Sequence, residues 1–379
     1  MKYITGQFAS AKVFTDNIEE TALEQINILC DQPFSEGSEI RIMPDVHAGA
    51  GCTIGTTMTI TGKIVPNMVG VDIGCGMLVV ELYDRDIDLR KLDSVIHKFV
   101  PCGFAIHQKV PFSMSNLNEL HCIGDLLDVS GQDQIDNRFQ RSLGTLGGGN
   151  HFIEVDEDEK GIKYLVIHTG SRNLGKQVAD HYQNIAIEDC SGNGIPDELC
   201  YLSGQHMLDY LDDMRICQEY AQKNRFRIAE IIADKMDFRA VVKPWESVHN
   251  YLDLDAFILR KGAISARQGE KVIIPLNMRD GCILGIGKGN KDWNYSAPHG
   301  AGRTMSRSKA KKMIGLEEFT ASMSGIYTTC VNESTIDESA FAYKPSQEII
   351  DAIGDTVEIT KIIKPIYNFK ATESAKKRR

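Results

Sequence analysis

The order of strand and helix signals along the chain limits what it can fold into more than any other feature. Short stretches rich in β-forming residues predict strands at 57–60, 77–82, 164–167 and 271–274. Glycines concentrate beside these stretches, at 49–55, 70–76, 144–149 and 281–302. Strands and helices do not alternate regularly enough for a doubly wound parallel sheet. We therefore predict an α+β fold, a single irregular domain of mixed β-sheets with surrounding helices over residues 1–371.

Helical patterns are clear in two places. Asp16 and Glu19 have the spacing of a capping box, which predicts a helix from there to about Cys30, with Pro33 just beyond its end. A longer pattern at 205–236 places apolar residues between charged ones at helical spacing. The segment 372–379 is basic and predicts a disordered tail.

Composition narrows the class of protein. No apolar run approaches the roughly 20 residues that a bilayer-spanning helix needs, and the first residues lack a secretory signal pattern, so we expect no membrane partner. The ten cysteines are scattered, which favours reduced thiols and a cytoplasmic location. The formal net charge of −10 argues weakly against a general nucleic-acid binder.

Local charge differs from the net charge. The segment 299–312 carries five Arg or Lys residues and no acid. A solvated basic loop is one interpretation. Because His299 opens the segment, a phosphate-facing patch is the better one.

Reactive side chains gather in six short segments, mostly among glycines: MPDVHAGAGCTIG, GVDIGCGM, LGTLGGGNHFIEV, VIHTGSRNLG, WESVHN and SAPHGAGR. Asp72 and Cys75 are three residues apart, so a carboxylate and a thiolate could share one metal ion or bridge two. Alone, a cysteine in a glycine-rich turn is more often a small packing residue. The company of His151, His168 and His249 favours a site for Mn²⁺, Zn²⁺ or Fe²⁺, and spacing does not choose among these ions.

Two of the segments suit phosphate chemistry. The GGGN run at 147–150 could bring backbone amides close to a phosphate, although such a run is more often a turn, and no Walker lysine follows it. The HGAGR segment is more specific. Its His299 could be a covalent nucleophile and its Arg303 could neutralise phosphate oxygens; the alternative is a glycine-rich turn with a surface arginine.

Taken together and in order, the motifs GVDIGCGM, GGGNHFIEV, VIHTGSR, VHN, RKGAISA and HGAGR resemble the RtcB family of RNA ligases. The resemblance runs from about Asp45 to Lys370. It implies a fold with a central hydrophilic metal cleft. It also implies an enzyme that joins 2′,3′-cyclic phosphate or 3′-phosphate RNA ends to 5′-hydroxyl ends, using GTP and two Mn²⁺ ions, in RNA repair.

The resemblance also implies a role for each matching residue. His299 would form a histidine–GMP intermediate. Cys75 would bridge the two ions, which His168 and His249 on one side and Asp72 and His151 on the other would complete. The expected nucleotide contacts are Asn150, Glu154, Arg303, Lys370 and Asn277, and the expected contacts near the RNA are Arg172, Lys261 and Asp45.

The chain departs from the family pattern at 276–282, where small residues are usual. Here Arg279 and Asp280 are bulky and charged, and together they suggest a surface ion pair. We expect this stretch to tune the choice of RNA. The departures are similar to those of a shorter bacterial paralogue sometimes encoded beside a release-factor homologue. That similarity implies this homologue as a partner, and broken ribosomal RNA or transfer RNA as substrate.

Two other functions compete with ligation. A metal-dependent RNA-end phosphatase or cyclic phosphodiesterase would need the metal ligands but not His299, Arg303 or Lys370. A non-catalytic RNA-binding relic would tend to lose metal ligands. All of these residues are present, which favours the ligase.

Overall fold

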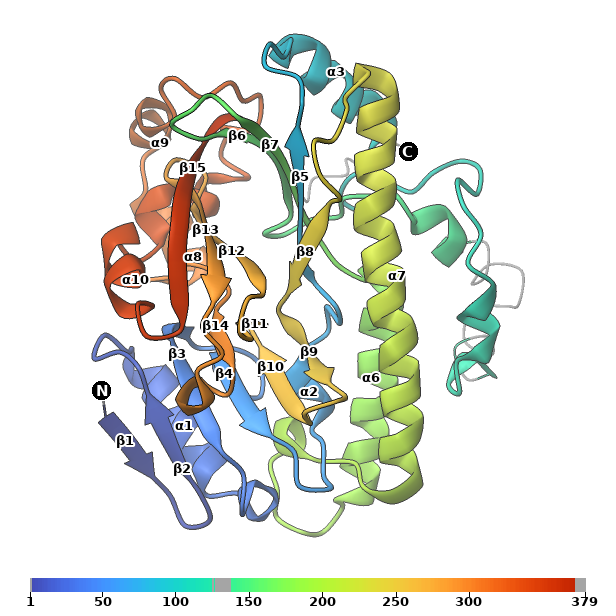
Figure 1. The fold of residues 1–379 in the computed structure, drawn as a ribbon. Coiled ribbons are helices and arrows are strands. Elements are labelled where there is room, and N and C mark those ends of the chain that lie inside the picture. Colours follow the sequence, from blue (N-terminus) through green and yellow to red (C-terminus); the bar gives the residue numbers. More distant parts are fainter. Residues whose placement is uncertain (1, 125, 127–137, 372–379) are drawn as a thin grey trace.

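Three β-sheets with helices packed around them form the molecule (Figure 1). A computed structural model describes residues 2–124, 126 and 138–371. The predicted tail, 372–379, lies outside the described residues. The architecture confirms the predicted α+β class with mixed sheets.

A seven-stranded sheet forms the centre of the molecule, in the order β12–β13–β15–β6–β7–β5–β8, with all neighbours antiparallel. Its edge strands meet: the backbone N–H of Ile273 on β12 donates to Ser247 Oγ on β8 at 3.3 Å. The sheet therefore curls almost closed around an apolar interior that includes Met77, Val166 and Ile273. The strands are β5 (Gly76–Leu82), β6 (Phe152–Glu157), β7 (Lys163–Thr169), β8 (Trp245–Val248), β12 (Lys271–Asn277), β13 (Gly281–Gly287) and β15 (Val357–Lys370).

A six-stranded sheet lies beside the first, in the order β1–β2–β3–β4–β10–β9, and a two-stranded sheet of β11 and β14 accompanies them. Only β2 and β3 are parallel in the larger of these, which makes it a mixed sheet. The strands are β1 (Lys2–Thr5), β2 (Ser10–Val13), β3 (Ile40–His47), β4 (Ile54–Thr59), β9 (Asn250–Asp253), β10 (Ile258–Lys261), β11 (Ala263–Ser265) and β14 (Ser296–Pro298).

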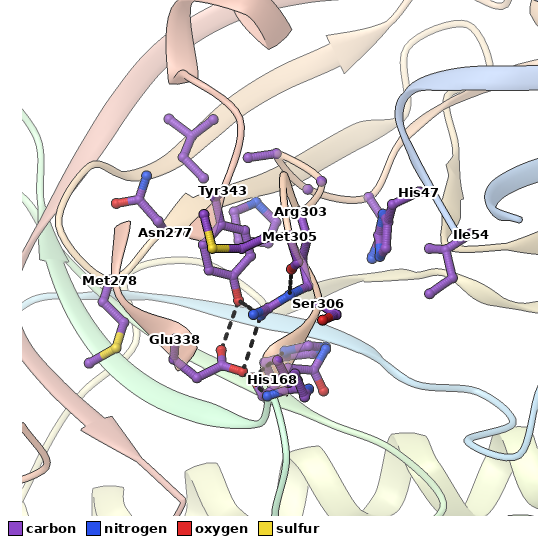
Figure 2. A pocket seen from close by; sticks show the side chains of 18 of the residues that line it. His47, Ile54, His168, Asn277, Met278, Arg303, Met305, Ser306, Glu338 and Tyr343 are labelled. Atoms are coloured by element: carbon purple, nitrogen blue, oxygen red, sulfur yellow. Dashed lines mark hydrogen bonds and ion pairs between the residues drawn. The ribbon is translucent and has the colours of Figure 1, made fainter. Parts of the chain in front are cut away.

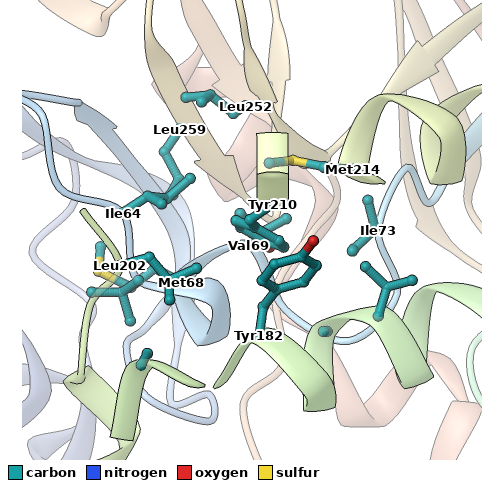
Figure 3. Packing of buried hydrophobic residues seen from close by; sticks show 14 of the residues in the cluster. Ile64, Met68, Val69, Ile73, Tyr182, Leu202, Tyr210, Met214, Leu252 and Leu259 are labelled. Atoms are coloured by element: carbon teal, nitrogen blue, oxygen red, sulfur yellow. The ribbon is translucent and has the colours of Figure 1, made fainter. Parts of the chain in front are cut away.

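Two long helices, α6 (Arg172–Asp189) and α7 (Gly204–Met236), run side by side along the sheets (Figure 1). Tyr182 of α6 and Tyr210 of α7 pack with ring centroids 5.0 Å apart. Figure 3 shows both rings among apolar side chains from other elements, including Val69 and Leu259. Burying such side chains is the main stabilising term in this layer, on the order of 1.5–3 kcal/mol for each large apolar group.

Shorter helices complete the fold. They are α1 (Glu20–Cys30), α2 (Pro66–Val69), α3 (Leu89–Phe99), α8 (Arg307–Met313), α9 (Leu316–Ser322) and α10 (Ser346–Ala352). The 3₁₀ turns are η1 (Pro33–Ser35), η2 (Ser115–Glu119), η3 (Asp197–Leu199), η4 (Lys291–Trp293), η5 (Ile336–Glu338) and η6 (Ala340–Ala342). Among the described residues, none of the helices combines the length and apolar character needed to cross a membrane.

The structure confirms the predicted helix at 205–236 and all four predicted strands, with slightly different ends. The predicted capping box is wrong. Helix α1 begins at Glu20, and the residue at its N-cap is Glu19, which makes no capping hydrogen bond. The side chain of Glu19 instead accepts from the backbone N–H of Ala48 at 2.7 Å, so a tertiary contact replaces the local cap.

Helix α6 was not predicted from the sequence. Its apolar residues Leu174, Val178 and Tyr182 recur at four-residue spacing and are all buried, which is a usable helical signal. The segment begins inside a glycine-rich motif, and Arg172 at its start has φ of +57°. Because of these two features, the sequence analysis did not predict this helix.

Candidate active site

Cys75 lies where three strands come together. It immediately precedes β5, which pairs with β7 on one side and β8 on the other. That pairing brings His168, on β7, and His249, just after β8, to the thiol. Asp72 lies in the turn before Cys75, whose N–H donates to the Asp72 carbonyl at 3.1 Å, and His151 directly precedes β6. The three nearby backbone ladders thus fix all five predicted metal ligands.

The ligand atoms form two groups that share Cys75. Its Sγ lies 3.3 Å from His168 Nε2, which in turn lies 3.3 Å from His249 Nε2. On the other side, Sγ lies 3.5 Å from His151 Nε2, and that nitrogen lies 2.9 Å from Asp72 Oδ2. Within each group all ligand atoms lie within 4.8 Å of one another. One thiolate between two sets of borderline ligands suits a pair of divalent transition-metal ions.

Two of the imidazoles are oriented by their other ring nitrogen. His151 Nδ1 lies 2.9 Å from the carbonyl oxygen of Leu146, and His168 Nδ1 lies 3.3 Å from that of Asn150. A proton on each Nδ1 donates to these oxygens and leaves the Nε2 lone pair free for a metal. Both histidines therefore present the correct nitrogen to Cys75.

Burial shifts the pKa values of several residues in the cluster. It lowers the pKa of His168 and of His249 well below the ordinary value, which keeps them neutral as metal binding requires. Burial alone would raise the pKa of Asp72, but its hydrogen bond to His151 and the nearby charges of His151 and Arg172 lower it to about 2. Burial and the charge of Asp72 raise the pKa of Cys75, so metal binding must displace a proton from its thiol.

A buried arginine of helix α7 bonds to the backbone next to the cluster. Arg225 is fully buried, and its Nη1 donates to the carbonyl oxygens of Gly74, at 2.8 Å, and Thr169, at 2.9 Å. These carbonyls belong to the neighbours of Cys75 and His168. The Arg225 charge is balanced by Glu246, at 2.8 Å. The helix thereby ties the β5 and β7 ends together at the ligands.

A cavity of about 710 Å³ opens beside this cluster (Figure 2). His168 lines it and connects it to the metal ligands. The other predicted site residues that line it are Asn150, Glu154, Asn277, His299, Arg303 and Lys370. The structure thus brings together side chains that the sequence scatters over 220 positions, from Asn150 to Lys370.

His299 is held by a buried carboxylate. Its Nδ1 lies 2.7 Å from Asp45 Oδ2, and its backbone N–H donates to the same oxygen at 3.1 Å. Asp45 is fully buried, and the His299 ring lies 4.9 Å from the ring of the metal-cluster residue His249. A proton on Nδ1 donated to Asp45 leaves Nε2 as the free, nucleophilic nitrogen.

The HGAGR turn requires its second glycine. Gly302 has φ of +75°, and a Cβ at this position would lie 2.3 Å from the carbonyl oxygen of Asp45. Any side chain there would push the turn away from the strand that carries Asp45. This close approach keeps His299 within reach of its carboxylate partner.

A network of ion pairs around Glu338 also lines the cavity (Figure 2). Lys370 Nζ lies 2.7 Å from Glu338 Oε2, and Arg303 Nη1 lies 3.8 Å from Oε1. Arg307 contacts the same carboxylate, and the Tyr343 hydroxyl donates to it at 2.8 Å. Burial alone would raise the pKa of Glu338, but the charges of Lys370 and Arg307 lower it to about 2. The carboxylate therefore stays ionised among its cations.

Glu154 and Asn277 also line the cavity. Burial raises the pKa of Glu154 to about 8, although its hydrogen bond with Asn368 and the charge of Lys370 oppose the shift. Asn277 Nδ2 donates to Asp280 at 2.9 Å. The suggested ion pair in this stretch is confirmed, with Arg279 Nε 2.8 Å from Asp280 Oδ1.

Arg172 and Lys261 do not line the cavity. Arg172 Nε donates to Thr145 Oγ1 at 3.2 Å. Its guanidinium lies where a Cβ on Gly147 would be, so it packs directly against the GGGN run. Lys261 is buried, and its Nζ donates to the carbonyl oxygens of Ala50 and Asn67. In these positions both side chains hold neighbouring loops.

The basic segment 299–312 divides in two. Arg303 and Arg307 line the cavity, whereas Lys309, Lys311 and Lys312 are exposed on α8. Of the five basic residues in this segment, the two arginines line the cavity and the three lysines do not.

Sequence reasoning missed Glu338 and Tyr343 as parts of the site, and it included Arg307 only as a member of the basic segment 299–312. No glycine-rich motif surrounds Glu338, and an acid in an irregular segment gives no signal. His47 also lines the cavity; it was noted in the first motif but given no role, and burial lowers its pKa to about 4.

Comparison with known proteins places these observations in a family. A family model described as tRNA-splicing ligase RtcB matches residues 33–371. The RNA-splicing ligase RtcB of Escherichia coli K12 is 30% identical over 405 residues, covering 97% of this chain and 98% of that protein. The tRNA-splicing ligase RtcB of Aeropyrum pernix is 30% identical over 417 residues, covering 86% of each chain. The RNA-splicing ligase RtcB2 of E. coli ATCC 25922 is 26% identical, covering 89% of this chain and 88% of that protein.

Proposed function

The chain belongs to the RtcB family, and from that premise we propose that it is a metal-dependent RNA ligase that joins 2′,3′-cyclic phosphate or 3′-phosphate RNA ends to 5′-hydroxyl ends through a histidine–GMP intermediate. One observation carries the proposal. A single cavity is lined by a metal-cluster histidine, His168, by an oriented histidine, His299, and by two cations, Arg303 as the proposed phosphate contact and Lys370 as the proposed guanine contact. Hydrolysis would not need the last three.

His299 is the proposed nucleophile. With Nδ1–H donated to Asp45, its Nε2 attacks the α-phosphate of GTP, the bond from that phosphorus to the β-phosphate oxygen breaks, and pyrophosphate leaves. The RNA 3′-phosphate then takes the GMP from the histidine. The 5′-hydroxyl attacks this activated phosphate and GMP leaves. A cyclic phosphate is first opened by water to a 3′-phosphate.

Two Mn²⁺ ions are the proposed occupants of the Cys75 cluster, one with His168 and His249 and one with Asp72 and His151. When bound, such ions neutralise phosphate oxygens during displacement. The protein's own contribution is position: Cys75 holds both groups of ligands together, and the His249 ring lies beside that of His299.

The nucleotide is proposed to bind between His299 and β15. Lys370, Asn150 and Glu154 are the proposed guanine-side contacts, and Lys370 Nζ already donates to the Asn150 carbonyl at 2.8 Å. Arg303 would steady phosphates and Asn277 would close the cavity beside them. Arg172 and Lys261 would then act on RNA only through the loops that they hold.

The proposed setting is RNA repair in the cytoplasm, with broken ribosomal RNA or transfer RNA as substrate and a release-factor homologue as partner. The support for this setting is the similarity of the departures at 276–282 to those of the shorter bacterial paralogue.

The test is covalent labelling. The protein is incubated with Mn²⁺ and GTP carrying radiolabel on the α-phosphate, and an acid-labile, alkali-stable adduct is expected. The same incubation with label on the γ-phosphate is the control and should leave the protein unlabelled. RNA ends that lose phosphate without sealing, with no protein adduct, would favour the phosphatase instead.

A further inference from the structure

A second group of potential metal ligands lies inside the curled seven-stranded sheet. It consists of Glu154 and Asp156 on β6 and Cys282 on β13. One ligand atom from each of the three residues lies within 4.8 Å of the others, and all three side chains are buried. The group shares no residue with the Cys75 cluster.

Asp156 is the unusual member. It is fully buried, and among the residues that the structure describes, neither of its carboxylate oxygens has a hydrogen-bond partner at ordinary distance; only the Cys282 thiol interacts with it closely enough to oppose the rise that burial causes in its pKa. Cys282, beside it, belongs to the apolar cluster of the sheet interior with Ile273 and Leu284. A carboxylate in such surroundings is costly unless a partner satisfies it, and an ion is one such partner.

None of the cations that the structure describes fills this role. Within the described part of the chain, no salt bridge reaches Glu154 or Asp156. The nearest charge that acts on Glu154 is Lys370, whose Nζ is already bonded to Glu338 and to the Asn150 carbonyl. Two acids and a thiol thus converge from two strands without a direct ion pair, and burial raises the pKa of all three, so they carry protons until an ion replaces them.

The backbone ladder is weakest at the same place. Strand β15 separates β6 from β13, and Pro365 on β15 lies opposite Asp156, where it offers no N–H. The register between β15 and β6 also shifts between Pro365 and Tyr367. A link from β6 to β13 would therefore strengthen the sheet where its hydrogen bonding is interrupted.

We propose that Glu154, Asp156 and Cys282 bind a divalent metal ion of the zinc type, in addition to the ions of the Cys75 cluster. Two carboxylate oxygens and a thiolate are suitable ligands for such an ion, with bonds of about 2.0–2.3 Å. Binding releases the protons that these groups carry in the absence of the ion. The ion joins β6 to β13 across β15 and fixes Glu154 at the wall of the cavity.

Cobalt spectroscopy of the full chain tests this proposal. Co²⁺ bound to a thiolate gives a ligand-to-metal charge-transfer band, and a Cys75→Ala background removes the other thiolate. In that background the band should persist. Adding Cys282→Ser should abolish it, and adding Asp156→Asn should weaken Co²⁺ binding by at least about tenfold. Adding Cys30→Ser, which changes a buried cysteine in α1, is the matched control and should leave the band unchanged.

Two results would overturn the proposal: no charge-transfer band in the Cys75→Ala protein, or a band that survives Cys282→Ser. Metal analysis keeps the test valid if the double variants fold poorly. With Cys75 intact, the isosteric Asp156→Asn protein should contain one zinc-type ion fewer per chain than the wild type, and equal contents would mean that protons alone neutralise the group. Neither measurement uses GTP, so failure of the proposed ligation and failure of this site give different results.

Discussion

Two neighbouring parts of the site, the metal cluster beside the cavity and the ion pairs that line it, are built in different ways. We call the metal wall the set Asp72, Cys75, His151, His168 and His249, of which His168 lines the cavity, and the ion-pair wall the set Arg303, Arg307, Glu338, Tyr343 and Lys370. Strand pairing positions the metal wall, because its residues lie on or beside β5, β6, β7 and β8. Side-chain contacts to one carboxylate, Glu338, position the ion-pair wall.

The two walls also differ in the source of their positive charge. The metal wall has fixed positions and supplies ligands rather than cations, so its function depends on metal loading. The ion-pair wall has its own cations, already neutralised by Glu338. The proposed nucleotide must therefore compete with Glu338 for these cations, its guanine for Lys370 and its phosphates for Arg303.

The largest effect should come from the residue between the walls. His299→Ala should lower GTP labelling by more than about a thousandfold, because it removes the proposed nucleophile, whose Nδ1 is held by the buried carboxylate of Asp45. The measurement is transfer of α-phosphate label to the protein, with circular dichroism to verify the fold. His97→Ala, at a half-exposed position on α3, is the matched control. Undiminished labelling of the His299 variant would rule out this nucleophile.

On the metal wall, Cys75→Ala should remove more metal than any single histidine substitution. The Cys75 thiol serves both ligand groups, whereas His249 serves one. Metal content per chain, measured after gel filtration, should fall below that of His249→Ala. Equal metal loss in the two variants would show that the thiol does not bridge.

On the ion-pair wall, Lys370→Met should weaken GTP binding by about 10- to 100-fold, the value of a charge-assisted hydrogen bond. Lys364→Met is the control, because Lys364 is exposed on the same strand. Titration of labelling against GTP concentration measures both. If both variants bind GTP alike, Lys370 does not contact the nucleotide.

Glu338→Gln should destabilise the protein by about 3–5 kcal/mol near neutral pH, because buried cations lose their partner. The pKa of Glu338 falls from its ordinary 4.5 to about 2 on folding. Its stabilising effect is therefore complete above pH 4.5 and is lost as the pH falls towards 2. Denaturant unfolding should show the gap between wild type and variant narrowing in that window. Glu333→Gln, exposed nearby, should behave like the wild type, and a gap independent of pH would contradict the ion-pair account.

The smallest effect should be at the edge of the ion-pair wall. Changing Arg279 and Asp280 together to glycine removes a partly exposed ion pair, which is worth at most about 1 kcal/mol. GTP labelling should stay within about fivefold of the wild type, while sealing of structured RNA nicks relative to linear ends should change. Loss of labelling with unchanged RNA preference would instead assign the stretch to the nucleotide pocket.

The sequence predicted the metal wall better than the ion-pair wall, for a physical reason. Ligands such as His151 and Cys75 lie in glycine-rich motifs, whose tight backbone conformations leave a pattern in the sequence. Glu338 is positioned by distant cations, and a long-range ion pair leaves no local pattern.

The same reason explains the errors in the fold. The helix at 205–236 was predicted because its own periodicity specifies it. The start of α1 was not, because Glu19 bonds to Ala48, which lies 29 residues away. Lys261 and Arg172 were expected near the RNA, and their buried contacts to backbone carbonyls could not be seen in the motifs that contain them.

The place of β15 in the central sheet has a consequence for biosynthesis. A nascent chain that has reached residue 356 already contains six of the seven strands. The missing strand is β15, which lies between β13 and β6 in the finished sheet. Ribosomes add about 5–20 residues per second, so this state lasts only briefly during normal translation. A ribosome that stalls there would leave two open sheet edges, which are prone to aggregate and attract chaperones. Activity should therefore appear abruptly, after residues 357–370 emerge from the exit tunnel, and truncated chains should be inactive and short-lived.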